Sequence, residues 1–266
     1  MDIPAELRTR LPTLLDQAVR AAKDSASEIL SGFRSPGLVI ERKADTSVVT
    51  PHDREAERQI RASLALARVP DAGITGEELG DQSDGAALRW LIDPIDGTLS
   101  YTRGIPLFGT LVALDDVRAH RGLLGVIHLP VFGETYSAYR GGGAFCDGLA
   151  IEVSAEHDVR SAMISVSSAE DFAKAGLAEG YQRLSGTAWR LRSNSDCWTH
   201  AMTARGAIDA LIEFSLNRWD IAATEVIIEE AGGRCLTRTS RTVPHKFDTV
   251  FGSARLVDEL ARLVGF

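Results

Sequence analysis

Apolar residues recur every three or four positions near the N-terminus, a spacing that predicts an amphipathic helix with one core-facing stripe. The stripe consists of Leu11, Leu15, Ala18, Ala22, Ala26, Ile29 and Phe33. We expect a short strand over residues 37–41 and a polar loop over 42–47. A second helix should begin at Pro51 with Thr50 as its N-cap and run toward Pro70, because proline suits the first turn of a helix and interrupts its interior.

The middle of the chain alternates short apolar runs with turn residues, a pattern typical of strands. Strands are expected over residues 73–75, 88–92, 108–114, 123–129 and 135–139. Consecutive strands joined by short turns favour an antiparallel meander. This part of the chain therefore predicts an N-terminal α+β half, residues 1–150, built on an antiparallel sheet.

Beyond residue 150 the pattern changes, because helical and strand-like segments begin to alternate. We expect strands over residues 163–166, 188–192 and 208–214. Helices are expected over residues 172–179, 196–205 and 221–230, and after Ser253. This alternation predicts a C-terminal α/β half, residues 151–266.

Composition and charge narrow the class of protein. The chain has 266 residues, of which 44% are hydrophobic, enough for a sizeable core. Its net charge of -8 argues against a nucleic-acid partner, and the lack of a long apolar run argues against a membrane span. The three cysteines show no paired spacing and the N-terminus is charged, unlike a signal peptide. We therefore expect a cytoplasmic protein without a disulfide framework.

Residues 90–98 carry the strongest chemical signal. An apolar run there ends in an Asp-Pro pair, which indicates a buried strand that stops at a turn. Asp93 and Asp96 can converge on one hard cation, while the backbone amides of Gly97 and Thr98 face an anion. A metal and a phosphate held together indicate phosphate-ester chemistry. The structural alternative is an ordinary turn in which both aspartates form only local hydrogen bonds.

Three further carboxylates are candidates, and each has a structural alternative. Glu77 follows the strand expected at 73–75 and could reach the same cation as Asp93, or it could lie in a solvated acidic loop. Asp220 could be a metal ligand or the N-cap of the helix after it. Asp53 could act in catalysis or form a capping box with Thr50. The histidines have no metal-ligand spacing, so we assign them to the core or the surface.

Taken together, these segments resemble the inositol monophosphatase family of Mg²⁺-dependent, lithium-sensitive phosphomonoesterases. The matching segments are residues 43–53, 76–78, 90–98 and 219–233. Each is weak alone, but all four in the family order are specific. The resemblance implies a layered α-β-α-β-α sandwich, a homodimer, and a site between the two halves of the chain.

The resemblance also implies a set of metal ligands. They would hold two or three Mg²⁺ ions, with Mn²⁺ as a possible substitute. The implied ligands of the first ion are Glu77, Asp93 and the carbonyl of Ile95. Those of the second are Asp93, Asp96 and Asp220. Glu77 would also help to place a third, weaker ion through water.

The implied catalytic residues are Glu77, Thr98 and Asp53. Thr98 and Asp53 would orient the attacking water, and the amides of Gly97 and Thr98 would hold the phosphate. The polar loop over residues 44–49 could be a mobile lid over this site.

The residues around the alcohol part of the substrate depart from the inositol pattern. Asp196 opens a helix in a segment that resembles the histidinol-phosphatase branch of the family. Glu213 lies seven residues before Asp220, where the family contacts the substrate. Two carboxylates would favour a cationic amino alcohol through charge-assisted hydrogen bonds. Asp196 could instead be only the N-cap of its helix.

The leading hypothesis is therefore hydrolysis of L-histidinol phosphate to L-histidinol and phosphate, a step of histidine biosynthesis. Hydrolysis of inositol-1-phosphate is the alternative. A third hypothesis, of another class, is a non-catalytic protein that binds a metal or a metabolite and regulates a partner. All the implied ligands are present in the sequence, which argues against this third hypothesis.

Overall fold

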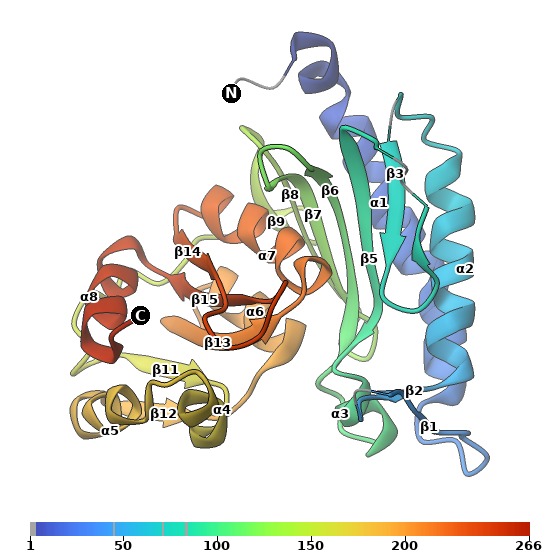
Figure 1. Cartoon of the computed structure of the whole chain (residues 1–266). Coiled ribbons are helices and arrows are strands. Elements are labelled where there is room, and N and C mark those ends of the chain that lie inside the picture. Colours follow the sequence, from blue (N-terminus) through green and yellow to red (C-terminus); the bar gives the residue numbers. More distant parts are fainter. Residues whose placement is uncertain (1–3, 45, 71, 83–84) are drawn as a thin grey trace.

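The computed structural model describes residues 4–44, 46–70, 72–82 and 85–266, and Figure 1 shows the arrangement. The first half of the chain is built on an eight-stranded sheet with the order β10-β9-β8-β7-β6-β5-β3-β4. Its strands are β3 (Ala72–Gly76), β4 (Gly80–Asp81), β5 (Leu88–Asp96), β6 (Gly109–Asp116), β7 (Arg121–Leu129), β8 (Glu134–Tyr139), β9 (Gly143–Cys146) and β10 (Leu149–Ala150). Neighbouring strands are antiparallel except β3 and β5, which pair in parallel. The predicted meander is confirmed for β5 to β8.

Helices cover both faces of this sheet (Figure 1). On one face lie α1 (Ala5–Gly32) and α2 (Pro51–Ala65), which pack on even-numbered strand residues such as Trp90 and Val112. On the other face lie α6 (Asp196–Ala204) and α7 (Arg218–Glu230), which pack on odd-numbered residues such as Leu91 and Leu111. Side chains alternate between the two faces along a strand, and helices cover both faces of this sheet. Residues on both faces are therefore apolar, and the central strands are continuous hydrophobic runs.

A five-stranded sheet forms the second half, with the order β12-β11-β13-β15-β14. The strands are β11 (Met163–Val166), β12 (Arg190–Arg192), β13 (Ala210–Leu216), β14 (Arg234–Thr239) and β15 (Phe247–Gly252). β11 pairs in parallel with β12 and β13, and the other pairs are antiparallel. Its outer face packs on α4 (Ala169–Lys174), α5 (Ala178–Thr187) and α8 (Ala254–Val264). The order of layers is therefore α-β-α-β-α, as predicted.

Some predicted elements are wrong in detail. Residues 37–40 are not a strand, and only Glu41–Arg42 (β1) pairs with Val48–Val49 (β2). The single helix predicted over 172–179 is two helices, α4 and α5, because Gly176 lies at φ +74° between them. β14 and β15 were not predicted as strands. The division at residue 150 stays a prediction: the first sheet ends at Ala150 and the second begins at Met163.

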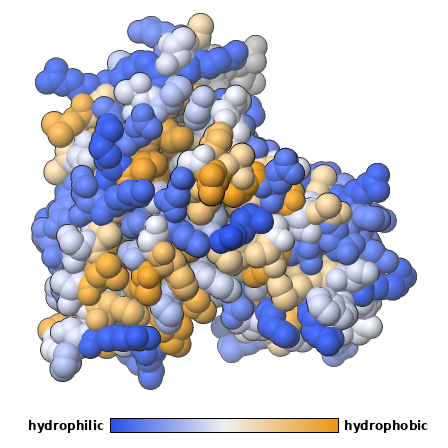
Figure 2. Space-filling model, turned by 180° about the vertical axis from the view of Figure 1, so that it is seen from behind, coloured by the Kyte–Doolittle hydropathy of each residue, from blue (hydrophilic) through white to orange (hydrophobic). Residues whose placement is uncertain are grey.

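Figure 2 shows the molecule from behind, where hydrophobic residues form separate groups among hydrophilic ones. One group lies at the end of the molecule that carries β1 and the short helix α3 (Thr98–Thr102). The exposed large side chains in and beside these elements are Val39, Ile40, Leu99 and Ile105. No helix in the described part of the chain has the length and apolar character that a membrane span needs.

Candidate active site

A bulge in β5 brings Asp93 and Asp96 to the same side of the sheet. Asp93 pairs with Leu111 and Asp96 with Gly109, so two residues of β5 stand opposite one of β6. Side chains three apart on a regular strand would point to opposite faces, and the extra residue removes this difference. The predicted turn at the Asp-Pro pair is wrong, because the strand continues to Asp96. The Thr110 hydroxyl donates to the Pro94 carbonyl at 2.8 Å and stabilises the bulge.

Asp220 reaches these two aspartates from α7. The N-cap of α7 is Asn217, so the alternative in which Asp220 is the N-cap is wrong. Asp220 occupies the third helical position and closes a capping box, with one of its oxygens accepting the Asn217 backbone amide at 2.7 Å. One carboxylate oxygen each from Asp93, Asp96 and Asp220 lies within 4.8 Å of the other two.

This cluster is electrostatically unfavourable without a cation. Burial raises the pKa of Asp93 well above its ordinary value, and the charges of Glu77, Asp96 and Asp220 raise it further. Burial and the charges of Asp196 and Asp220 likewise raise the pKa of Asp96. Burial and Glu77 raise the pKa of Asp220 to about 7. Buried carboxylates with only oxygen donors fit a hard divalent cation such as Mg²⁺, whose charge would relieve their repulsion.

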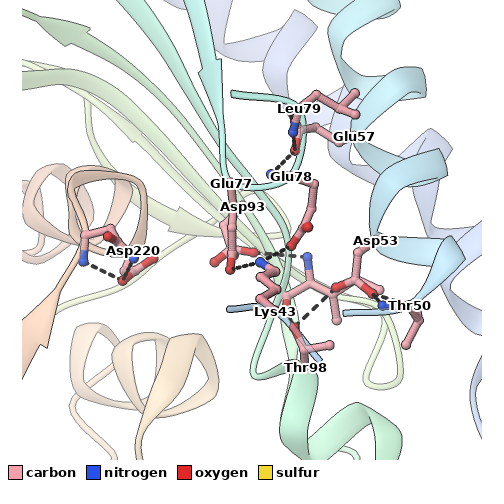
Figure 3. A network of polar contacts seen from close by, with 12 residues as sticks. Lys43, Thr50, Asp53, Glu57, Glu77, Glu78, Leu79, Asp93, Thr98 and Asp220 are labelled. Atoms are coloured by element: carbon pink, nitrogen blue, oxygen red, sulfur yellow. Dashed lines mark hydrogen bonds and ion pairs between the residues drawn. The ribbon is translucent and has the colours of Figure 1, made fainter. Parts of the chain in front are cut away.

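Glu77 lies beside Asp93 at the end of β3, where its backbone amide donates to the Ile92 carbonyl at 3.1 Å (Figure 3). Its carboxylate accepts a hydrogen bond from Lys43 Nζ at 2.7 Å, and the same Nζ lies 2.6 Å from Glu78. Burial raises the pKa of Glu78 to about 7, although Lys43 acts against this. Lys43 therefore provides a positive charge at the edge of the acidic cluster.

Glu57 holds the turn that carries Glu77. Its carboxylate on α2 is fully buried and accepts the backbone amide of Glu78 at 2.7 Å and that of Leu79 at 3.3 Å (Figure 3). Arg61, one helical turn later, donates to Glu57 at 2.7 Å and to the Gly80 carbonyl at 2.5 Å. Sequence reasoning missed both residues, because nothing near residue 57 indicates that its partners lie about twenty positions later.

Asp53 forms the capping box considered for it and also lies beside Thr98. Thr50 is the N-cap of α2, and Asp53 closes the capping box by accepting the Thr50 amide at 2.8 Å. The other Asp53 oxygen lies 3.2 Å from the Thr98 hydroxyl, which also lies 2.8 Å from the Ile95 carbonyl. Burial raises the pKa of Asp53, against the hydrogen bonds from Thr50. Asp53 and Thr98 thus form a connected pair beside the cluster.

Gly97 makes the turn from β5 into α3. Its φ of +85° is a conformation that glycine adopts without strain, and an added Cβ would lie 2.8 Å from the Leu107 carbonyl oxygen. The amides of Gly97 and Thr98 therefore open α3 directly after the aspartates of β5. Such amides at the start of a helix can hold a phosphate oxygen.

Asp196 and Glu213 lie on the C-terminal side of the cluster. The N-cap of α6 is Ser195, so the alternative in which Asp196 is the N-cap is wrong. Asp196 has φ +65°, and its amide donates to Glu213 at 3.2 Å. Burial and Glu213 raise the pKa of Asp196 to about 6. The next amide, of Cys197, donates to Asp96, which links this part of the site to the aspartates of β5.

The fold and this site define a class of protein, the layered phosphatases whose carboxylates gather at the end of a central strand. The model of the inositol monophosphatase family matches residues 11–264, and the chain belongs to this family. A histidinol-phosphatase of Mycobacterium tuberculosis is 35% identical over 90% of this chain and 94% of that protein. An inositol monophosphatase of Dictyostelium discoideum is 30% identical over 96% of each chain.

Solved structures agree with this assignment. An inositol monophosphatase (IMPase) of Thermotoga maritima has a TM-score of 0.81 at 27% identity and covers 94% of this chain and 96% of its own. The extragenic suppressor protein suhB of Bartonella henselae has a TM-score of 0.83 over 95% of this chain and 98% of its own, and at 24% identity it supports the fold. The family, the fold and the enzyme class predicted from the sequence, a phosphoric monoester hydrolase, are confirmed.

Proposed function

We propose that this protein hydrolyses L-histidinol phosphate to L-histidinol and phosphate, with Mg²⁺ as its cofactor. The observation that supports this choice of substrate is the pair Asp196 and Glu213 beside Asp96. The Asp196 amide donates to the Glu213 carboxylate at 3.2 Å. The histidinol-phosphatases that this chain resembles at 34–35% identity support the same substrate. Inositol-1-phosphate is the second candidate, supported by the inositol monophosphatases at 30–34% identity.

In this proposal five residues hold two Mg²⁺ ions. Asp93 serves both ions; Glu77 and the Ile95 carbonyl complete one set, and Asp96 and Asp220 the other. Glu77 also takes part in a third, weaker site, and Mn²⁺ can replace Mg²⁺. When bound, the metal lowers the pKa of a water and offsets the charge of the phosphate ester. Lys43 contacts one Glu77 oxygen, so Glu77 would bind a metal through its other oxygen or after displacement of the ammonium.

Thr98 and Asp53 orient the attacking water. The Thr98 hydroxyl can donate to Asp53 while its oxygen accepts from the water, so that the water's lone pair points at phosphorus. The amides of Gly97 and Thr98 hold phosphate oxygens. Asp196 and Glu213 accept from the ammonium and imidazole of histidinol, whereas a polyol gains only neutral donors there. Asp220 borders the same part of the substrate.

The test is phosphate release with Mg²⁺ from both esters, side by side. A kcat/KM ratio of tenfold or more in favour of histidinol phosphate, about 1.4 kcal/mol of transition-state binding, supports the proposal. Asp196→Ala should then raise KM for histidinol phosphate far more than for inositol phosphate. Preference of the wild type for inositol phosphate would transfer the proposal to that substrate. Turnover of neither would favour a non-catalytic role.

The metal assignment has its own test. Asp93→Asn removes one charge from the residue proposed to serve both ions, so Mg²⁺ binding by calorimetry and turnover should both fall by more than about a hundredfold, beyond the usual effect of outer partners. The matched control is Asp24→Asn, on an exposed position of α1. Full activity of Asp93→Asn would refute the assignment.

The remaining proposals concern sensitivity, assembly and location. Li⁺ should inhibit turnover, as the family resemblance implies.

We further propose a homodimer, supported by the exposed hydrophobic residues in and beside α3. Light scattering that gives only a monomer mass would contradict it. A cytoplasmic location is supported by three cysteines without a disulfide and is tested by cell fractionation.

A further inference from the structure

A buried chain of hydrogen bonds runs behind Glu213. One Glu213 oxygen lies 2.7 Å from His200 Nε2, and the other accepts the Asp196 amide at 3.2 Å. The second ring nitrogen of His200, Nδ1, lies 2.8 Å from the Thr224 hydroxyl. All three side chains are buried: Glu213 is 2% exposed, His200 1% and Thr224 0%. The His200 and Phe251 rings also pack in a T-shaped arrangement, with ring centroids 5.8 Å apart.

The chemistry of these groups determines which atoms donate and which accept in this series of hydrogen bonds. An ionised Glu213 only accepts, so His200 Nε2 must carry the proton that it donates. In the neutral imidazole Nδ1 is then an acceptor, and the Thr224 hydroxyl must donate to it. Glu213 therefore selects the tautomer of His200, the Thr224 hydroxyl holds the ring in place through Nδ1, and His200 in turn holds the rotamer of Glu213. A neutral histidine leaves the negative charge of Glu213 available to a cationic ligand.

We propose that His200, with Thr224, is a positioning residue that holds Glu213 ready for the cationic part of the substrate and so sets the preference for amino-alcohol phosphates over polyol phosphates. The inference rests on the proposed function, since it assigns a role to Glu213 in the same site. A free glutamate would lose rotamer freedom each time the substrate binds, whereas this one is already ordered. His200 hydrogen-bonds to Glu213, which is proposed to bind the alcohol part of the substrate, so the effect should be confined to that part.

Thr224→Val is the sharpest test, because it keeps the shape of the side chain and removes only the hydroxyl. We expect kcat/KM for histidinol phosphate to fall about three- to tenfold, mainly through KM, as one side chain loses its preorganisation. Turnover of inositol-1-phosphate, whose hydroxyls are only neutral donors to Glu213, should change much less. The matched control is Thr203→Val on α6, whose buried hydroxyl donates to the Thr199 carbonyl at 2.9 Å and not to His200.

A second pair of variants guards against a merely structural effect. The amide nitrogen of His200→Gln can replace Nε2 as the donor to Glu213, whereas His200→Leu has no donor. The glutamine variant should therefore keep more of the substrate preference than the leucine variant, at similar melting temperatures. ¹⁵N NMR of the wild-type imidazole should show the neutral form protonated at Nε2, and Thr224→Val should alter this signal.

The outcomes separate the inference from the proposed function. If the wild type shows no preference for histidinol phosphate, the proposed function fails. If the wild type shows the preference and Thr224→Val and His200→Leu retain it, the inference fails alone. Equal losses for both substrates, or an imidazole protonated at Nδ1, would also overturn it.

Discussion

Glu57 shows how a single buried residue determines the geometry of the proposed metal site. Its two oxygens accept the backbone amides of Glu78 and Leu79 in the turn after Glu77. Gly76 is required beside it, because an added Cβ would lie 2.0 Å from a Glu57 oxygen. The carboxylate is balanced by Arg61, whose side chain is 9% exposed. Glu57 therefore fixes where Glu77 points.

Glu57→Gln should weaken both the fold and the metal site. The amide cannot accept from Arg61 and from the backbone as a carboxylate does, and breaking a buried pair costs about 3–5 kcal/mol. Calorimetry should show Mg²⁺ affinity reduced about 10- to 100-fold, the usual effect of an outer partner of a ligand. Glu55→Gln on the same helix is the control, since its pair with Arg58 is largely exposed and such pairs contribute about 0–1 kcal/mol. Equal Mg²⁺ affinity in both variants would contradict the role of Glu57.

The raised pKa values of the carboxyl groups in the cluster predict how pH changes the stability of the metal-free protein. The pKa of Asp220 is about 7 in the folded state, raised by burial and by Glu77 above the ordinary value of 3.8. The folded state then binds the proton more tightly than the unfolded chain, so stability falls as pH rises from about 4 through about 7. Thermal melts in EDTA should show this decrease, and Mg²⁺ should remove most of it. A metal-free melting temperature that rises over this range would contradict the electrostatic account.

At the scale of helices and strands, the sequence predicted correctly those features that depend on interactions between residues close together in the chain. Thr50 and Asp53 close their capping box within four residues, and the helix that they begin was predicted correctly. The strand predicted over residues 37–41 failed because an apolar pattern does not make a strand without a partner, and pairing begins only at Glu41. The bulge after Asp93 depends on β6, and the contact of His200 with Glu213 spans thirteen positions. Such distant pairings carry no signal within one segment.

The packing of α7 on β7 sets the position of Asp220. Gly125 allows this close approach, because an added Cβ would lie 2.4 Å from the carbonyl oxygen of Ala223. Gly122 meets Ala222 in the same way, at 2.7 Å. Small residues on both elements therefore bring the helix backbone directly onto the sheet.

Gly125→Ala should displace α7 and weaken metal binding. Overpacking of this kind costs about 1–3 kcal/mol, which a shift of the helix would partly relieve at the expense of the geometry around Asp220. Thermal melts and Mg²⁺ calorimetry should both show losses. Gly186→Ala in α5 is the control: its Cβ meets nothing within 4 Å, and alanine stabilises an exposed helix by about 1 kcal/mol. Unchanged Mg²⁺ affinity in Gly125→Ala would mean that Asp220 does not depend on this contact.

At the scale of the whole molecule, the layer of α6 and α7 belongs to both sheets. Its residues pack on Leu111 of the first sheet and on Leu211 and Phe251 of the second in one continuous core. The proposed site draws its ligands from this layer and from the first sheet, since Asp220 lies on α7 and Asp93 and Asp96 lie on β5. Any change in how α7 sits between the sheets would therefore change the distances between the carboxylates.

Arg218 on α7 forms an ion pair with Asp115 on β6 and so connects the two halves of the chain. Its removal should lower the stability of the protein. Arg218 lies two residues before Asp220 in sequence. Its guanidinium contacts Asp115 on β6 at 2.7 Å and Glu225 on α7 at 2.6 Å. All three side chains are largely buried, so Arg218→Met would leave two carboxylates without their cation, a loss of about 3–5 kcal/mol. We expect a lower melting temperature and, because α7 is held less firmly, weaker Mg²⁺ binding. Arg234→Met is the control, since its pair with Asp258 is about half exposed and should contribute under about 1 kcal/mol. If Arg218→Met lowers stability but leaves Mg²⁺ affinity at the level of Arg234→Met, the link stabilises the fold without positioning the site.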